Sequence, residues 1–380
     1  METIKMLHIS DVHIGAPFQF LGRRGGEQRL ALREALARVA LIAREERYHL
    51  LVIAGDLFDS AYETSDADVS FVIGCLHDAG PSCHVVILPG GHDHFSAGSI
   101  YERELKRFEA LGNVRVLAPG RRVIEIPELS LAVHGKALTS NVAAESGLTG
   151  LAPVPGRRWN VCLAHCSVAG FSADLDTGDT PARLEDIERG FDYVGLGHWH
   201  SYRVLRENAP PVLYSGSPEI VARDQQGAGF AVSAVLSSGG IAFERRAVGK
   251  RRVESRSIDC TGLASTEEFI QRVLKAVPPD PNLILDLSLS GLIGIDSALD
   301  PGVGSSELER HYFSVRLAGK GPSREISREA LLAVPEETVA GALVRSMLKK
   351  IESSEGETRE LYEEALQLAY QLFKGRDLIG

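Results

Sequence analysis

Short, mainly apolar runs that are followed within a few residues by aspartate or histidine are the feature that most restricts the fold of this 380-residue chain. Five such runs read IKMLHIS, LLVIA, VVILP, VCLA and YVGL. Apolar runs of this length, closed by glycine, proline or polar residues, are typical of buried strands, because a helix needs a longer periodic segment. Between the first runs lie stretches of helical periodicity, such as Glu27–Glu46. Strands that alternate with helices predict a layered α/β fold with a mixed sheet or sandwich.

The first 250 residues hold most of the predicted elements. Helices are expected at Glu27–Glu46, Asp66–Asp78 and Ser99–Ala110. Strands are expected at Ile4–Ile9, Leu50–Ala54, His84–Leu88, Val161–Ala164, Tyr193–Leu196, Val212–Tyr214, Gly229–Leu236 and Ile241–Arg245. We therefore expect residues 1–250 to form one domain of mixed β-sheets flanked by helices.

The pattern changes after residue 250. A helix near Thr266–Ala276 and strands at Leu283–Leu289 and Tyr312–Leu317 predict a small α/β domain over residues 251–335. Residues 336–380 are acidic and predict a helical tail.

The last part of the tail has apolar residues that recur on one helical face, namely Leu361, Ala365, Leu368, Ala369 and Leu372. Such a face must be buried somewhere. It belongs either to a helix docked on its own chain or to a helix that binds another protein.

Composition excludes several classes of protein. The formal net charge of −10 argues against a wholly basic nucleic-acid coat, although local arginine clusters remain. No apolar run reaches membrane-spanning length, so no membrane span is expected. The first residues lack the apolar segment and cleavage site of a secretory signal. The five cysteines are few, odd in number and scattered, which favours reduced thiols and a cytoplasmic location.

Polar groups follow the apolar runs in a fixed order: Asp11-x-His13, Gly55-Asp56-x-x-Asp59, Gly90-Gly91-His92-Asp93, His165 and Gly197-His198-x-His200. Open α/β sheets bind ligands beyond the carboxyl ends of their strands, so these groups are expected to converge. Carboxylates together with imidazoles suit Mn, Fe or Zn, and the lack of cysteine disfavours a structural zinc site. The number of ligands exceeds the needs of one ion, which predicts two neighbouring ions that share a carboxylate.

Any one of these motifs is common in turns. The hypothesis of a two-metal site therefore rests on the occurrence of all five motifs in this order, each after an apolar run. The remaining histidines are better read as packing or surface residues, namely His8, His49, His77, His84, His134 and His311.

This order of motifs resembles the calcineurin-like metallophosphoesterase superfamily. The flanking sequences LHISDVHIG, VIAGDLFDS and GLGHWH…YSGSPE resemble the bacterial SbcD/YhaO-type DNA repair exonucleases. The resemblance is strong over residues 4–250 and looser beyond. It implies a layered metallophosphoesterase domain over 1–250, a capping domain that guides DNA over 251–335, and a helical tail over 336–380.

The resemblance also implies roles for individual residues. One metal would be bound by Asp11, His13, Asp56 and His200. The second metal would be bound by Asp56, His165 and His198, with Asp56 bridging. His92 would act beside the scissile phosphate as an acid or phosphate stabiliser, and Asp59 would orient its imidazole through a carboxylate contact. Two such cations acidify a water and clamp a phosphate oxygen. Family members usually prefer manganese, and the residues also permit iron or zinc.

Gly91 departs from the family pattern, because an asparagine that ligates the second metal stands there in the family. Three readings are open: a water or substrate oxygen completes the site, His94 swings in, or the second metal is weak and the enzyme poor. Gly91→Asn is expected to be tolerated, since asparagine accepts the positive φ that a glycine can adopt at a turn.

The leading functional hypothesis is a DNA phosphodiesterase that acts as an exonuclease in repair. The resemblance implies an SMC-like coiled-coil ATPase partner and a homodimer, with no membrane attachment. Arg23, Arg24 and Arg29 follow the first metal motif and are the best-placed residues to neutralise DNA phosphates. The alternatives are a phosphoesterase for nucleotides or small phosphodiesters and a weakly active or non-catalytic DNA-binding subunit. The net charge and Gly91 keep both alternatives open.

Overall fold

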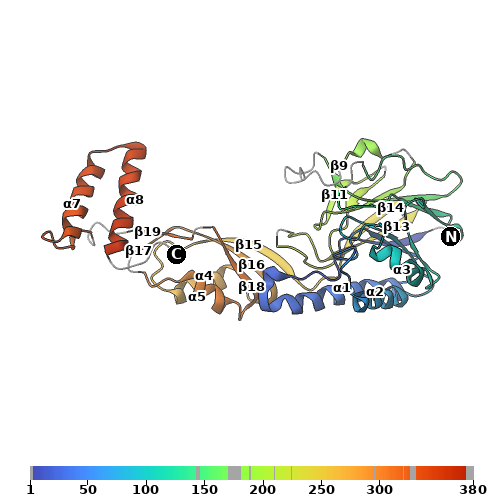
Figure 1. The fold of residues 1–380 in the computed structure, drawn as a ribbon, viewed down its shortest axis with the longest axis horizontal. Coiled ribbons are helices and arrows are strands. Elements are labelled where there is room, and N and C mark those ends of the chain that lie inside the picture. The colour runs from blue at the N-terminus through green and yellow to red at the C-terminus, as the bar shows by residue number, and fades with distance from the viewer. Residues whose placement is uncertain are drawn as a thin grey trace. The chain divides into compact units, whose positions relative to one another are not determined.

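The computed structural model describes residues 3–142, 146–169, 181–187, 190–208, 210–223, 225–294, 297–319, 321–325 and 331–373 (Figure 1). Residues 326–330 of the predicted capping domain and 374–380 of the predicted tail lie outside this range. The chain divides into two compact units, Met1–Val253 and Glu254–Gly380.

The first unit contains two six-stranded mixed sheets. The first sheet has the order β14-β13-β1-β2-β3-β4. Its strands are β1 (Ile4–Ile9), β2 (Leu50–Ala54), β3 (His84–Leu88), β4 (Val114–Val116), β13 (Phe230–Ser237) and β14 (Gly240–Ala247). Strands β1 to β4 run parallel, and β13 pairs antiparallel with β1 and β14.

The second sheet has the order β11-β12-β10-β7-β6-β5. Its strands are β5 (Val123–Ile126), β6 (Leu131–Gly135), β7 (Trp159–His165), β10 (Tyr193–Gly197), β11 (Arg203–Arg206) and β12 (Val212–Tyr214). The four central strands are parallel, and the two edge strands are antiparallel. Shorter elements of this unit are η1 (Gln19–Arg24), η2 (Pro127–Leu129), η4 (Leu184–Asp186), β8 (Ser167–Val168) and β9 (Pro181–Ala182).

One core joins the two sheets. Buried residues from both contribute to it, among them Met6, Val52, Val86, Val133 and Leu163. Helices α1 (Gly25–Glu45) and α2 (Asp66–Asp78) lie side by side along the first sheet, and α3 (Ile100–Glu109) packs near β4 (Figure 1). The predicted α/β fold with mixed sheets flanked by helices is thereby confirmed.

The second unit has a small sheet of order β15-β16-β18, formed by β15 (Arg252–Asp259), β16 (Asp280–Ser290) and β18 (Tyr312–Ala318). Strand β15 begins just before the boundary between the units. The unit also contains α4 (Thr266–Ala276), α5 (Pro301–Leu308), β17 (Leu292–Gly294) and β19 (Ser323–Glu325). Phe269, Leu285 and Tyr312 lie in its core.

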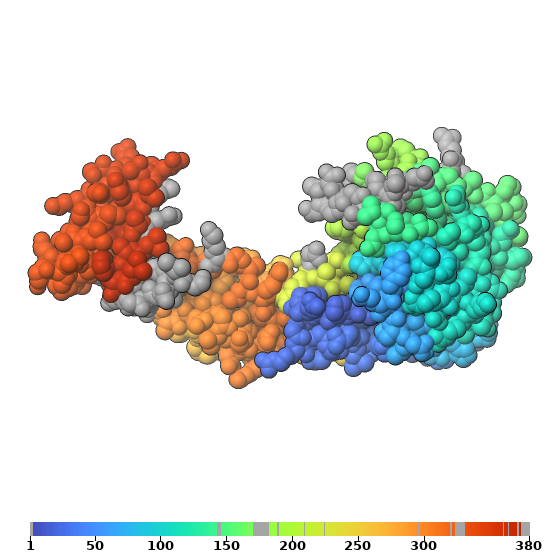
Figure 2. All heavy atoms as spheres, in the orientation of Figure 1, coloured from blue at the N-terminus to red at the C-terminus, as the bar shows by residue number. Residues whose placement is uncertain are grey.

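The tail forms a hairpin of two helices, α7 (Val339–Glu352) and α8 (Gly356–Phe373), which pack together in Figure 2. Leu366 and Tyr370 of α8 are buried with Val344 and Ile351 of α7. The predicted apolar face is not the docked one, because Leu361, Leu368 and Leu372 remain 63%, 54% and 58% exposed. No helix in the described part of the chain is long and apolar enough to cross a membrane.

Candidate functional site

The predicted site residues lie where the parallel strands of the two sheets end. Strands β1, β2 and β3 are neighbours in the first sheet, and β7 and β10 are neighbours in the second. Parallel strands present their carboxyl ends at one edge, so the loops that follow them meet there. Those ends carry Asp11 and His13 after β1, Asp56 and Asp59 after β2, His92 after β3, His165 at the end of β7, and His198 and His200 after β10.

Left-handed backbone occurs at four of these residues. The φ angles are 54° at Asp11, 52° at His13, 52° at Asp56 and 99° at His198. Residues other than glycine rarely adopt this region, at a cost of about 1–3 kcal/mol each, and such residues cluster at functional sites. Hydrogen bonds between the loops hold this geometry: the amide of His13 donates to the Asp56 carbonyl at 2.9 Å.

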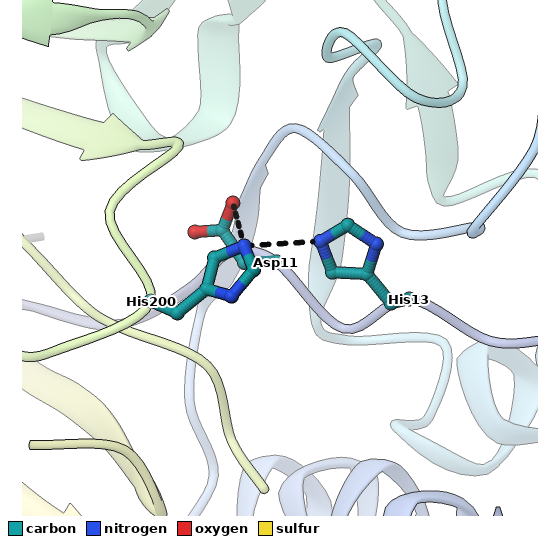
Figure 3. Close-up of side chains that lie close together, drawn as sticks. All are labelled: Asp11, His13 and His200. Carbon is teal, nitrogen blue, oxygen red and sulfur yellow. Dashed lines mark hydrogen bonds and ion pairs between the residues drawn. The ribbon is translucent and has the colours of Figure 1, made fainter. Parts of the chain in front are cut away.

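Asp11, His13 and His200 form one group whose ligand atoms lie within 4.8 Å of one another (Figure 3). The Nε2 atoms of His13 and His200 are 3.2 Å apart, and His200 Nε2 is 3.9 Å from Asp11 Oδ1. His13 Nδ1 lies 3.1 Å from Asp59 Oδ1, so that Nδ1–H can donate to Asp59 and Nε2 can keep its lone pair. Two imidazole nitrogens that face each other beside a carboxylate suit a cation.

Charges around the group favour such a cation. Burial opposes protonation of His13, but the hydrogen bond to Asp59 and the charges of Asp56 and Asp11 raise its pKa. Burial lowers the pKa of His200, which keeps its imidazole neutral and able to act as a ligand.

Asp56 and His165 lie in a second group with Asp11. His165 Nδ1 lies 3.0 Å from the Ala54 carbonyl and donates to it, which leaves Nε2 as a bare acceptor. That atom is buried, has no hydrogen-bond partner among the described residues, and faces Asp56 Oδ2 at 3.2 Å. Two acceptors face each other here, so a proton or a metal ion must lie between them.

His198 lies next to this group. Its ring centroid is 5.4 Å from that of His165, and its amide donates to Asp11 Oδ1 at 2.9 Å. Burial, reinforced by His165, lowers the pKa of His198 to about 4, so the ring is neutral and can bind a metal. Its side chain is not part of the three-residue ligand groups found among the described residues.

His92 lies beside both groups rather than apart from them. Its ligand atom is within 4.8 Å of those of His13 and Asp56, and its amide donates to Asp56 Oδ1 at 2.9 Å. The imidazole is exposed, and Nδ1 lies 3.1 Å from the backbone carbonyl of Asp59. The expected contact with the Asp59 carboxylate is therefore wrong, because that carboxylate is turned to His13.

Three glycines let these loops approach closely. A Cβ at Gly90 would lie 2.3 Å from Asp56 Oδ1, and one at Gly197 would lie 1.9 Å from the Ala54 carbonyl oxygen. Gly55 has φ +94° and its Cβ would enter the His165 ring. Each position thus requires glycine, because a side chain there would collide with neighbouring side chains or backbone.

Gly91 is different. Its backbone is not left-handed, so the expectation of a positive φ is wrong. A Cβ there would meet the Asn141 backbone oxygen at 3.4 Å, an ordinary contact, and no other described atom within 4 Å. His94 is 8% exposed and does not join a ligand group of the described residues.

Asp93 has a larger part in the site than its sequence position suggested. Its carboxylate accepts hydrogen bonds from the amides of Asp56 at 3.2 Å, Phe58 at 3.1 Å and Gly90 at 2.7 Å, and from the Tyr101 hydroxyl at 2.8 Å. It thereby ties the loop after β2 to the loop after β3. Burial and the charge of Asp56 raise the pKa of Asp93 to about 6.

The predicted DNA-contacting arginines lie outside the ligand groups. Arg23 and Arg24 end η1, and Arg23 and Arg29 are exposed. Arg29 donates to the Pro17 carbonyl at 2.9 Å. All three follow the loop that carries His13 along the chain.

This chain is similar to known proteins. Residues 4–202, a little over half of the chain, match the calcineurin-like phosphoesterase family. The DNA double-strand break repair protein Mre11 of Sulfurisphaera tokodaii is 24% identical over 233 residues, which cover 59% of this chain and 56% of that protein. The uncharacterized metallophosphoesterase YhaO of Bacillus subtilis is 23% identical over 291 residues, which cover 72% of this chain and 67% of that protein.

A solved structure, a dimetal phosphatase from Danio rerio, aligns with 65% of this chain and 97% of its own at 13% identity and a TM-score of 0.41. The chain spans little more than half the length of the Mre11 protein it matches. The family match and the carboxylate and imidazole groups at the strand ends support a metal-dependent phosphoester hydrolase with two divalent ions, and this chain belongs to the calcineurin-like phosphoesterase family.

Proposed function

We propose that this chain is a dinuclear metal-dependent phosphodiesterase that degrades DNA as an exonuclease in repair. The observation that carries the proposal is the convergence of buried carboxylates and imidazoles at one edge of two sheets, with acceptor atoms facing one another. The names of two relatives, a DNA double-strand break repair protein and a metallophosphoesterase, support the substrate and the chemistry.

The residues divide into two ligand sets that share one carboxylate. Asp11, His13, Asp56 and His200 would hold one cation, and Asp56, His165 and His198 the other. Two divalent ions in these positions would polarise a phosphodiester and lower the pKa of a water that attacks it. The imidazole content favours manganese over magnesium, which prefers oxygen ligands.

His92 is the residue proposed to act on the substrate. Its imidazole is exposed at the edge of the ligand groups, and the Asp59 carbonyl fixes its Nδ1. The opposite nitrogen, Nε2, is then directed away from Asp59 and can contact a phosphate oxygen or protonate a leaving group. Asp59 supports the site twice, through its carbonyl to His92 and its carboxylate to His13.

The decisive experiment compares substrates and metals in one assay. Linear, hairpin and single-stranded DNA are incubated with the metal-stripped protein plus Mn²⁺ or Mg²⁺, beside a generic phosphodiester. We expect chelation to abolish activity and Mn²⁺ to restore DNA degradation better than Mg²⁺. Equal turnover with Mg²⁺ would argue against the proposed ligand set, and hydrolysis of the generic substrate without DNA cleavage would refute the nuclease.

Gly91 favours a second candidate, a weakly active DNA-binding subunit. Its lack of a side chain removes a ligand that the family supplies to the second metal. Tight DNA binding, with only weak hydrolysis of both DNA and the generic phosphodiester, would support this candidate. A phosphoesterase for nucleotides would instead show no salt-sensitive DNA binding, whereas phosphate contacts by Arg23, Arg24 and Arg29 would give such sensitivity.

We further propose that the second unit serves assembly, with its small sheet guiding DNA and its helical hairpin binding a coiled-coil ATPase. The support is the exposed apolar set Leu361, Leu368 and Leu372 on α8, which lies beside the docked residues Leu366 and Tyr370.

Five free, buried cysteines fit a reducing cytoplasm, and a homodimer stays a prediction.

A substitution tests the docking role of α8 better than a truncation, because removing α8 would expose the buried residues Val344 and Ile351 of α7. Leu368→Glu should leave the hairpin folded and weaken capture of the ATPase subunit by the protein. Leu30→Glu, at an equally exposed site on α1, is the matched control. Equal capture by both variants would remove the basis for α8 as the docking helix.

A further inference from the structure

Tyr62 is an exposed aromatic residue on a rigid loop. Its side chain is 53% exposed, although the preceding residue, Ala61, is buried. The Ser60 hydroxyl accepts from the amides of Tyr62 at 3.3 Å and Glu63 at 3.1 Å, and the Ala61 carbonyl accepts from the Ile100 amide at 2.7 Å. The loop thus holds the tyrosine in one place while its ring faces solvent.

The ring itself is fixed at two points. Its hydroxyl lies 2.8 Å from the Ser96 hydroxyl, and its centroid lies 5.6 Å from that of His94 with 74° between the planes. In such an edge-to-face pair the imidazole covers at most one face of the tyrosine ring. With 53% of the side chain exposed, the ring keeps a surface that a flat group can contact. An exposed aromatic ring held in this way loses little conformational entropy when a flat group stacks on it.

Both residues of this pair lie close in sequence to residues of the proposed active site. Tyr62 is three positions after Asp59, whose carbonyl contacts His92, and His94 is two positions after His92. Three residues span at most about 11 Å. The Tyr62 backbone therefore lies within about 11 Å of that of Asp59, whose carbonyl contacts His92, and an extended single strand spans such a distance in a few nucleotides.

Resting on the proposed DNA phosphodiesterase, we propose that Tyr62 is a stacking platform for one nucleobase of the substrate strand, next to the phosphate that is cleaved. Stacking requires a base whose face is not covered by its neighbours in a duplex, so the site selects unpaired ends or single strands. Every base has an aromatic face, so the preference is for unpaired structure rather than for sequence. The competing explanation is that Tyr62 only anchors its loop through the hydroxyl.

Three proteins separate these explanations. Tyr62→Leu removes the ring and the hydroxyl, Tyr62→Phe removes the hydroxyl alone, and wild type is the reference. Each is assayed with Mn²⁺ on a single-stranded oligonucleotide, on a fully abasic oligomer with the same backbone, and on oligonucleotides with one abasic position within three nucleotides of the cleaved bond. KM and kcat are measured separately.

We expect Tyr62→Leu to raise KM for the oligonucleotide by roughly 5- to 150-fold and Tyr62→Phe to change it little. Neither variant should change KM on the abasic oligomer. In wild type, one abasic position near the cleaved bond should raise KM as much as Tyr62→Leu does. If Tyr62→Leu and wild type have the same KM on the oligonucleotide, the stacking role is overturned. If Tyr62→Phe loses as much activity as Tyr62→Leu, the hydroxyl contact is what matters, and Tyr62 only anchors its loop. Failure of wild type to cleave any of these substrates refutes the nuclease itself.

Discussion

The Nε2 atom of His165 lies 3.2 Å from Oδ2 of Asp56, and both side chains are almost fully buried. Burial lowers the pKa of His165, but Asp56 outweighs it and raises that pKa to about 10. Burial also opposes ionisation of Asp56, yet His165 and His13 hold its pKa well below its usual range. The pair therefore requires a positive charge, and a divalent ion can replace the proton.

Asp56→Asn should remove more metal than any other single substitution in the site. It deletes a carboxylate that lies in two ligand groups, with His13 and His92 and with Asp11 and His165, and that is proposed to serve both ions. Since even outer partners of a metal ligand contribute about 10- to 100-fold in affinity, the loss should be at least of that order. Elemental analysis after dialysis measures it, and unchanged metal content would refute the shared role.

The same variant has a readout that needs no metal. In the metal-free protein, the pKa of His165 should fall from about 10 to below its ordinary value, because burial then acts without Asp56. NMR titration of the His165 ring follows this change. A pKa that stays high would mean that other charges, such as Asp11, dominate the site.

His92→Gln should spare the metals and lower turnover by about 10²- to 10⁴-fold, the usual contribution of a general acid or base. The geometry makes this a sharp test, because His92 is also close enough to His13 and Asp56 to bind an ion. Metal content and kcat are compared with wild type. Loss of an ion from the variant would move His92 from substrate contact to metal binding.

Much of the fold follows from local sequence. The bounds expected for Ile4–Ile9, Leu50–Ala54 and Asp66–Asp78 agree with the structure, because each run is bounded by polar or turn residues. Strands such as Leu131–Gly135 were not predicted. The five residues LAVHG carry little periodic signal, and pairing with the distant strand Trp159–His165 defines them as a strand.

The site was predictable as a set of residues but not in its contacts. Order along the chain indicated which side chains meet at the strand ends. It could not show that Asp59 turns its carboxylate to His13 and its carbonyl to His92, since both depend on loop geometry. The tail shows the same limit, because helical periodicity identified an apolar face but packing against α7 selected Leu366 and Tyr370.

His8 should make the first unit sensitive to mild acid. It is fully buried beside the Tyr193 hydroxyl at 3.0 Å, and burial lowers its pKa from 6.5 to about 3, partly offset by Asp11. Between pH 3 and 6.5 the unfolded chain therefore binds more protons than the folded one. The stability due to neutral His8 is lost as pH falls below 6.5, by about 1.4 kcal/mol at pH 5.5.

His8→Gln removes this titration. Urea unfolding of the metal-free protein at pH 7 and 5.5 measures it, and the fluorescence of Trp159 and Trp199 reports on the first unit. The difference in unfolding free energy between pH 7 and 5.5 should be about 1.3 kcal/mol smaller in the variant than in wild type, because a small part of the effect is already lost at pH 7. His77→Gln, on the exposed surface of α2, is the control and should behave as wild type. Parallel pH profiles of all three proteins would contradict the assignment.

Gly91→Asn should be tolerated by the fold and should raise occupancy of the second metal. The backbone at Gly91 is not left-handed, and a Cβ there meets the Asn141 carbonyl oxygen at an ordinary 3.4 Å. An amide oxygen beside Asp56 and His165 is a neutral and modest ligand. The gain should therefore appear at limiting Mn²⁺ and vanish at saturation.

Gly90→Ala is the matched control, because its Cβ would lie 2.3 Å from Asp56 Oδ1 and must displace that ligand. Metal stoichiometry and nuclease rate across a Mn²⁺ titration should improve for Gly91→Asn and fall for Gly90→Ala. If wild type already holds two ions tightly and Gly91→Asn changes neither metal stoichiometry nor nuclease rate, a water or His94 completes the site. The glycine then does not weaken metal binding. If Asn abolishes activity while metal binding rises, the open space at Gly91 is needed for the approach of the substrate.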